Sequence, residues 1–204
     1  MGELTSAEQE YENLLKAREP VGHSWRLARL ADLFMLQGKL QEAKDLTIQG
    51  IELSEKYGQN VWKSLWHLGK AGLHITMKNP EKALKEADKA WSAAVEAEYP
   101  RGQRSSFSTK AWAYIEMGSI DEAIQEAERL KEMIAESLNQ KRMRDYFYLM
   151  RKIEIKRENY PKAIDYLKNA LSMTCYGPLT KPASWINSLA LAYYTNGDLE
   201  KAIE

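Results

Sequence analysis

The chain has 204 residues, 44% of them hydrophobic, and its 29 basic residues are balanced by 29 acidic ones. This length is enough for one large domain or a short repeat array. Because a neutral chain has no overall field to attract phosphate backbones, we expect no nucleic-acid partner. No run of 18 apolar residues occurs and the N-terminus is polar, so we expect no membrane partner and no signal peptide.

Residues 1–22 contain one short amphipathic stretch, with Ala7, Tyr11, Leu14 and Leu15 at helical spacing. This stretch is too short for the repeat described next. We therefore interpret residues 1–22 as an N-terminal cap or the remnant of a preceding repeat.

An octapeptide recurs along the rest of the chain, as GKLQEAKD, KNPEKALK, GSIDEAIQ, ENYPKAID and GDLEKAIE. Its aligned alanines are Ala43, Ala83, Ala123, Ala163 and Ala202, so the period is constant to within one position. A fixed period of this length indicates a solenoid. The predicted repeats are residues 23–59, 60–99, 100–139, 140–178 and a truncated 179–204.

Each period divides into two amphipathic stretches. In the third, Ser105 to Met117 predicts one helix, Gly118-Ser119 a turn, and Ile120 to Leu138 the next helix. No segment alternates with period two, so we expect no strand. Alanine on the face of the second helix favours close approach of the two helices in a hairpin.

Three segments resemble the tetratricopeptide repeat family. They are SLALAYYTNGDLEKAI (188–203), Ala111-Trp112-Ala113-Tyr114 with Gly118 and Ala123, and Leu68-Gly69-Lys70-Ala71 with Ala83. The period of about 40 residues exceeds the family's usual ~34 and is similar to kinesin light chains and maltose-type activators. The resemblance implies an all-α, right-handed superhelical solenoid of antiparallel helical hairpins, with no cofactor.

The fourth repeat departs from this pattern. Strict alignment places Arg151 and Glu154 on the buried face, where two charges are costly. We expect instead a shift of one residue, with an extra residue in the turn near Arg157. The residues buried by that shift are Tyr146, Leu149, Met150 and Ile153.

The sequence contains no pattern typical of a metal site or a catalytic site, so we expect that the protein is not an enzyme. His67 and His74 lie about 10 Å apart along one helix, too far to share a metal ion. Cys175 cannot form an internal disulfide, which agrees with a cytoplasmic location, and no histidine occurs in the second half to activate it.

The resemblance implies that the first helix of each hairpin lines a concave groove that binds a partner. Trp112 is the strongest candidate, because Ala111 and Tyr114 already occupy the packing face and large aromatics are common binding anchors. The positions where some relatives hold a terminal carboxylate are not basic here, so that function is not expected. The candidate partner-binding residues are Trp25, Asp32, Trp112, Glu116, Tyr148, Lys152, Lys156, Asn187, Leu191 and Tyr194.

Charge is uneven in the second half. Residues 121–136 are mainly acidic and residues 141–157 mainly basic, on helices expected to pack antiparallel. Two interpretations stand: the helices pair with each other, or the basic strip captures an acidic partner segment.

Our leading hypothesis is therefore a scaffold that binds a protein or peptide in the groove. One alternative is a ligand-sensing regulatory domain of a larger signalling or transcription-regulating protein. Another is a self-assembly module that associates through exposed repeat ends. Because GDLEKAIE opens a helix at the last residues, we expect the chain to be a fragment of a longer protein.

Overall fold

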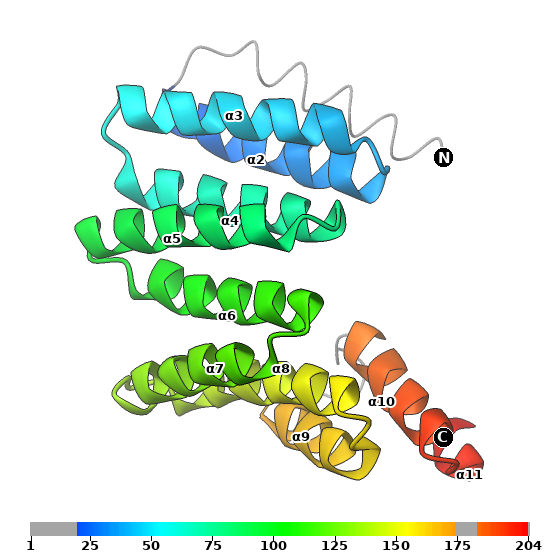
Figure 1. Cartoon of the computed structure of the whole chain (residues 1–204). Helices are drawn as coiled ribbons and strands as arrows, with labels where there is room; N and C mark the ends of the chain where they lie inside the picture. Colours follow the sequence, from blue (N-terminus) through cyan, green and yellow to red (C-terminus); the bar gives the residue numbers. More distant parts are fainter. Residues whose placement is uncertain (1–19, 174–182, 204) are drawn as a thin grey trace. The chain divides into compact units, whose positions relative to one another are not determined.

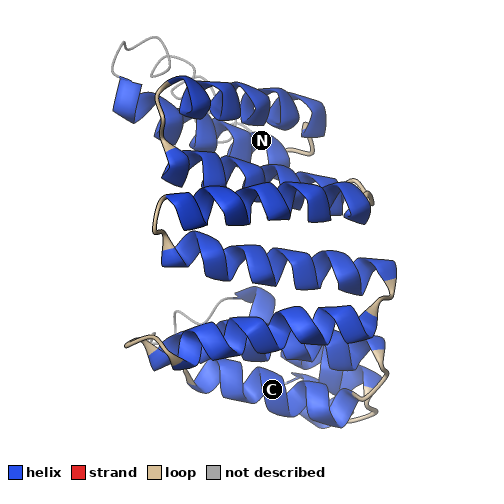
Figure 2. Ribbon diagram, turned by 60° about the vertical axis from the view of Figure 1, so that its left-hand side comes forward, coloured by secondary structure: helices blue, strands red, loops and turns tan. Residues whose placement is uncertain are grey.

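A computed structural model describes residues 20–173 and 183–203, which form helices and tight turns with no strand among them (Figure 2). The predicted N-terminal cap lies mostly outside these residues, and so does Cys175. The chain divides into two compact units, residues 1–109 and 110–204, which are described separately below. None of the described helices is both long and apolar enough to span a bilayer.

The first unit consists of two helical hairpins and the start of a third (Figure 1). From α2 to α5 each helix packs on the next, and short turns make neighbouring helices antiparallel. Leu30, Leu33 and Phe34 form a core with Leu73 of the next hairpin. The helices are α2 (Pro20–Leu36), α3 (Leu40–Lys56), α4 (Asn60–Thr76), α5 (Pro80–Glu96) and, up to residue 109, α6 (Pro100–Met117).

The second unit continues the pattern from residue 110. Its helices pack in chain order, α7 on α8, α8 on α9, and α9 on α10. Ile164 of α9 is buried against Ala192 and Tyr193 of α10. After the end of α6 come α7 (Ile120–Ala135), the 3₁₀ turn η1 (Gln140–Arg142), α8 (Met143–Lys156), α9 (Tyr160–Ser172), α10 (Ala183–Thr195) and α11 (Leu199–Ile203).

In every described hairpin, the same kind of turn joins the first helix to the second. One residue in each turn has a left-handed backbone, and the next N–H donates to a carbonyl five positions earlier, as in a Schellman motif. Glycine is suited to this conformation because it lacks a Cβ. The left-handed residues are Gly38, Lys78, Gly118, Glu158 and Gly197, with φ of 76°, 58°, 80°, 60° and 86°.

The alanines that define the period lie where the hairpins close. Ala43, Ala83, Ala123 and Ala163 are fully buried on the second helices. A methyl group at this position lets the two helices approach closely, and larger residues such as Leu130 and Ile134 fill the space farther along α7. The predicted all-α array of antiparallel hairpins is thus confirmed.

The fourth hairpin corrects the sequence prediction. Tyr146, Leu149, Met150 and Ile153 are buried as expected, but Arg151 and Glu154 are buried too, at 6% and 1% exposure. The turn after α8 has no extra residue, because its left-handed Glu158 follows Gly118 of the preceding hairpin by one full period.

Glu154 tolerates burial because its carboxylate is compensated. Asn159 Nδ2 donates to Glu154 Oε2 at 3.0 Å, and Lys162 Nζ and Arg157 Nη1 lie 3.4 and 3.6 Å from Oε1. Asn159 and Arg157 come from the turn, and Lys162 comes from α9. A buried charge is costly, as the sequence argument holds, but here three partners supplied by the turn and the next helix offset the cost.

Candidate functional site

One position of the repeat contributes most to the predicted binding face. This position falls on the first helix of every hairpin, and consecutive residues in the set are 40, 40, 40 and 39 positions apart. Four of the five are predicted site residues. The five residues are Asp32, Gly72, Trp112, Lys152 and Leu191.

In the second unit, two residues of this set are in contact. Lys152 Nζ of α8 lies 4.0 Å from the ring centroid of Trp112 on α6, within range of a cation–π interaction. Trp112 Nε1 donates to Glu116 Oε1, one turn along α6, at 3.4 Å. The indole is nevertheless 40% exposed, so a large aromatic surface remains open to a partner.

The charge of Lys152 is perturbed by this environment. Burial lowers its pKa to about 8, the neighbouring Arg151 contributes in the same direction, and Glu116 opposes the shift. The ammonium group is therefore mostly charged at neutral pH but poorly hydrated. A poorly hydrated cation interacts strongly with an incoming carboxylate.

The remaining α8 candidates lie on the same face. Tyr148 is half-buried, and the guanidinium carbon of Arg151 lies 4.4 Å from the centroid of its ring. Lys156 is exposed one turn beyond Lys152. Arg151, a residue outside the predicted site, thus lies against Tyr148 and directly precedes Lys152 in the chain.

The acidic helix α7 does not neutralise this basic face as a whole. Arg129 and Lys131 of α7 bind Glu126 and Glu128 of the same helix at 2.7 and 2.9 Å. Arg157, at the end of α8, reaches across to Asp121 at 3.9 Å. Local pairing within α7 therefore accounts for part of its negative charge.

The three candidates on α10 share one exposed face. Asn187, Leu191 and Tyr194 are spaced by four and three positions, which places them on consecutive turns of one side of the helix. All three are exposed. They offer an amide and two apolar side chains to a partner.

In the first unit, Trp25 and Asp32 are linked by Arg29. The Arg29 guanidinium lies 5.9 Å from the Trp25 ring centroid, and its Nη1 lies 3.2 Å from Asp32 Oδ2. Burial raises the pKa of Asp32, although Arg29 lowers it in part. A hollow of about 70 Å³ next to Asp32 is lined by Met35, Trp62 and Gly69 among others.

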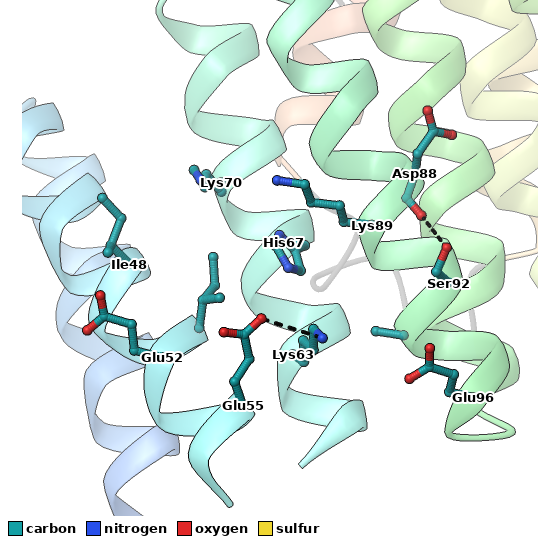
Figure 3. A pocket seen from close by; sticks show the side chains of 12 residues that line it. Ile48, Glu52, Glu55, Lys63, His67, Lys70, Asp88, Lys89, Ser92 and Glu96 are labelled. Carbon is teal, nitrogen blue, oxygen red and sulfur yellow. Dashed lines mark hydrogen bonds and ion pairs between the residues drawn. The ribbon is translucent and has the colours of Figure 1, made fainter. Parts of the chain in front are cut away.

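A larger cavity opens between α3, α4 and α5, away from the predicted residues (Figure 3). Its volume is about 530 Å³. Figure 3 shows Glu52 and Glu55 on one side, His67 at the floor, and Lys89 and Ser92 on the other side. The lining is thus mainly polar, with Ile48, Ile51 and Ala93 as its apolar part.

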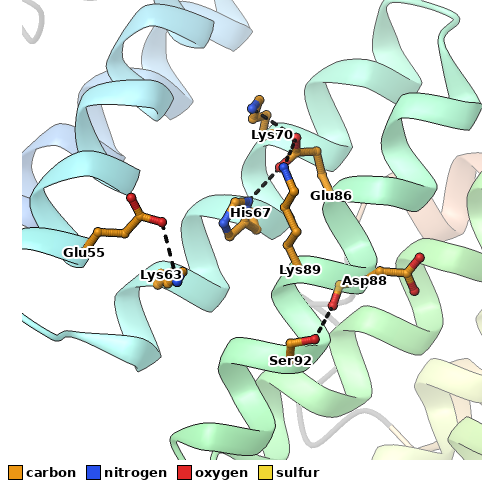
Figure 4. A network of polar contacts seen from close by, with 8 residues as sticks. All are labelled: Glu55, Lys63, His67, Lys70, Glu86, Asp88, Lys89 and Ser92. Carbon is orange, nitrogen blue, oxygen red and sulfur yellow. Dashed lines mark hydrogen bonds and ion pairs between the residues drawn. The ribbon is translucent and has the colours of Figure 1, made fainter.

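A buried ion network stabilises the floor of this cavity (Figure 4). His67 Nδ1 and Glu86 Oε2 are 2.6 Å apart, and Glu86 Oε1 lies 3.0 Å from Lys70 and 3.4 Å from Lys89. Burial lowers the pKa of His67 although Glu86 opposes this. Burial would raise the pKa of Glu86, but hydrogen bonds from Lys70 and His67 hold it below its usual value.

This network lies outside the predicted site residues, although the sequence carries a signal for it. The residues that follow His67 at intervals of one period are Phe107 and Phe147, so a histidine in this position is an exception. Among the described residues, no group of three His, Cys, Asp or Glu side chains is placed to hold a metal ion.

No model of a known protein family and no curated protein sequence matches the chain. Solved structures do match. Rap protein complexed with competence and sporulation factor superposes with a TM-score of 0.79 at 14% identity, over 95% of this chain and 54% of that one. NprR in complex with its cognate peptide NprX gives 0.74 at 17% identity, over 98% and 59%.

A third match is the putative kinesin light chain from Podospora anserina, whose repeats are described as nearly identical and TPR-like. Its TM-score is 0.62 at 16% identity, over 92% of both chains. The chain has the tetratricopeptide repeat (TPR) fold. The predicted likeness to kinesin light chain repeats is thus confirmed at the level of the TPR fold, while the chain spans little more than half of Rap and NprR.

Proposed function

We propose that this TPR-fold chain is a scaffold that binds a peptide or protein segment on the first helices of its hairpins. The observation that carries the proposal is the exposed indole of Trp112, held by Glu116 and covered on one side by Lys152. A rigid aromatic next to a poorly hydrated cation suits a segment with an apolar side chain close to a polar or charged group.

The distribution of exposed side chains supports the first helices as the binding face. Trp25, Trp112 and Leu191 are exposed well inside α2, α6 and α10. A helix with large apolar groups in solvent at its centre gains stability when a partner covers them. An exposed apolar residue at a helix end, such as Leu36, is weaker evidence for a binding face, because side chains at helix ends are often exposed to solvent.

The solved structures give a precedent for the type of ligand. NprR, of which this chain spans 59%, was solved with its cognate peptide. That peptide belongs to NprR, and an identity of 17% does not transfer it to this chain. It supports only the class of ligand, which we take to be an extended peptide.

The experiment is selection from a displayed library of random dodecapeptides, followed by affinity measurement on variants. Trp112→Ala should weaken the selected peptides at least tenfold, as expected for an aromatic anchor that contributes about 1.4 kcal/mol or more. Tyr194→Ala should weaken peptides that extend to α10. Tyr57→Ala is the matched control, because Tyr57 is similarly exposed but lies in the turn after α3.

The selection can contradict the proposal in two ways. If the library yields no binder, the chain is not a peptide scaffold. If it yields binders whose affinity is the same for Trp112→Ala, Tyr194→Ala and Tyr57→Ala, the binding face lies elsewhere. Circular dichroism of each variant separates loss of binding from loss of fold.

A second candidate function is favoured by the cavity between α3, α4 and α5. Its volume of about 530 Å³ falls in the range of small-molecule sites, which agrees with a ligand-sensing domain. A thermal-shift screen that finds stabilisation by small metabolites and none by selected peptides would favour this function over the scaffold.

A further inference from the structure

Arg151 breaks the strongest pattern in the first helices. The equivalent residues of the other four hairpins are Ala31, Ala71, Ala111 and Ala190, at intervals of 40, 40, 40 and 39 positions with Arg151 in the fourth place. Ala31, Ala71 and Ala111 are buried, as the close approach of packed helices requires. One hairpin therefore places the largest basic side chain where the others use a methyl group.

The guanidinium of Arg151 is buried without an opposite charge. The residue is only 6% exposed, and its Nε has no hydrogen-bond acceptor. Its partner is the neutral Tyr148, through a cation–π contact and a hydrogen bond, and no carboxylate of the described chain forms an ion pair with it. Glu154, one turn later on α8, is engaged by Arg157 and Lys162 instead.

A second cation lies next to this one. Lys152 is adjacent in sequence and its ammonium group rests on Trp112, while Lys156 adds a third positive charge one turn later on α8. Glu116 is the acid that acts on Lys152, and its carboxylate also accepts the indole N–H of Trp112. The face of α8 next to α6 thus carries an excess of positive charge that is partly withdrawn from water.

A buried charge that lacks its counter-charge destabilises the free protein. Such an arrangement is explained when a ligand supplies the missing charge. A guanidinium binds a carboxylate through two parallel hydrogen bonds, and an adjacent ammonium group strengthens the pair. The aromatic rings of Trp112 and Tyr148 would flank the same ligand.

We propose that Arg151 and Lys152 form a seat for an anionic group, a carboxylate of the bound segment, between the rings of Trp112 and Tyr148. This inference rests on the proposed peptide-binding function and specifies its ligand: a segment with an acidic side chain next to an apolar residue. Inorganic phosphate offers similar anionic oxygens, so it serves as the competing source in the test.

The seat has a pH dependence that follows from Lys152. The groups that face its ammonium are Arg151 and Lys156 on α8 and Glu116 on α6. Because the pKa of Lys152 is about 8, carboxylate affinity should be nearly constant from about pH 5.5 to 7, where the ligand carboxylate is ionised, and fall above pH 8, as the free amine accumulates. Lys152→Arg keeps the charge at all these pH values and should abolish the decline.

The first arm of the test uses small anions and the whole chain. The Nε–Hε resonance of Arg151 and the indole resonance of Trp112 are followed by NMR during titration with sodium acetate or inorganic phosphate, with sodium chloride as the ionic-strength control. Acetate should shift both resonances with saturation. Lys152→Met should lower the affinity for acetate in this titration at least tenfold. Lys168→Met, which removes an exposed charge on α9, should leave that affinity unchanged.

The second arm uses the peptides selected from the library. Replacing their Asp and Glu by Asn and Gln should lower affinity for the wild-type chain tenfold or more and have little effect on affinity for Arg151→Met. Peptides that bind equally well with and without carboxylates overturn the seat but leave the scaffold function standing. Acetate binding without any peptide binder leaves the seat standing and refutes the scaffold.

Two further results would overturn the seat. In the first, acetate shifts the Nε–Hε resonance of Arg151 no more than sodium chloride does. In the second, phosphate saturates the resonances at much lower concentration than acetate and the selected peptides lack acids. The second result would assign the cluster to a phosphate-bearing ligand. Thermal unfolding of Arg151→Met and Lys152→Met shows whether each variant remains folded during these measurements.

Discussion

The contact between hairpins in the first unit can be tested with a single methyl group at Gly50. This residue lies inside α3, opposite the indole of Trp66 on α4. A Cβ at position 50 would overlap Cε2 and Cδ2 of the Trp66 ring. Such an overlap lies far inside van der Waals contact, so the ring or the helix must move.

The free-energy change of Gly50→Ala has two parts of opposite sign. Alanine is favoured over glycine in a helix by about 0.8–1 kcal/mol. Overpacking a filled core costs about 1–3 kcal/mol, and the Trp66 ring has little room because it is buried and packs on Trp62 at 6.5 Å between centroids. We therefore expect a net destabilisation of up to about 2 kcal/mol, or a fall of a few degrees in Tm.

Gly72→Ala is the matched control. Gly72 lies inside α4, and a Cβ there would meet no atom within 4 Å. The same methyl group should therefore stabilise the chain by about 0.5–1 kcal/mol. Thermal unfolding followed by circular dichroism measures both variants. A rise in Tm for Gly50→Ala equal to that for Gly72→Ala would refute the packing of α3 on Trp66.

Four other substitutions test further features of the fold. Glu158→Gly should stabilise the chain by about 0.5–1 kcal/mol in urea unfolding, because φ at this turn is 60°, and Gly118→Ala should destabilise it by a similar amount. Arg151→Met should raise the Tm of the unliganded chain, because it removes a buried charge; a lower Tm would show that the charge is compensated. His67→Phe should reduce the loss of stability as the pH falls below about 6.5, measured by Tm against pH. Burial lowers the pKa of His67, so folding opposes its protonation, and His74, whose pKa is also lowered, retains part of the effect.

The fold was predictable because the repeat combines several independent signals. The alanine spacing, the turn residues and the apolar spacing of Ile120 to Leu138 all indicate hairpins, and each repeat supports the interpretation of the others. The residue type gave the least indication of the turn at Lys78 and Glu158, which have left-handed backbones although neither is glycine. The Schellman hydrogen bonds of the turn override the preference at both positions.

The buried charges could not be predicted from local sequence, because their partners come from other elements. Lys162 of α9 compensates Glu154 of α8, and Glu86 of α5 meets His67 of α4. A rule that excludes charge from the core therefore failed in the fourth hairpin. By contrast, the contact of Lys152 with Trp112 follows from their equivalent places in adjacent repeats, which the period itself reveals.

The most direct test of the central claim is a crystal structure of the chain with a library-selected peptide. We expect the peptide to lie across the exposed indole of Trp112, with a carboxylate within hydrogen-bond distance of Arg151 and Lys152. A peptide bound on the outer faces of α7 and α9, or in the cavity between α3 and α5, would contradict the assignment of the binding face to the first helices.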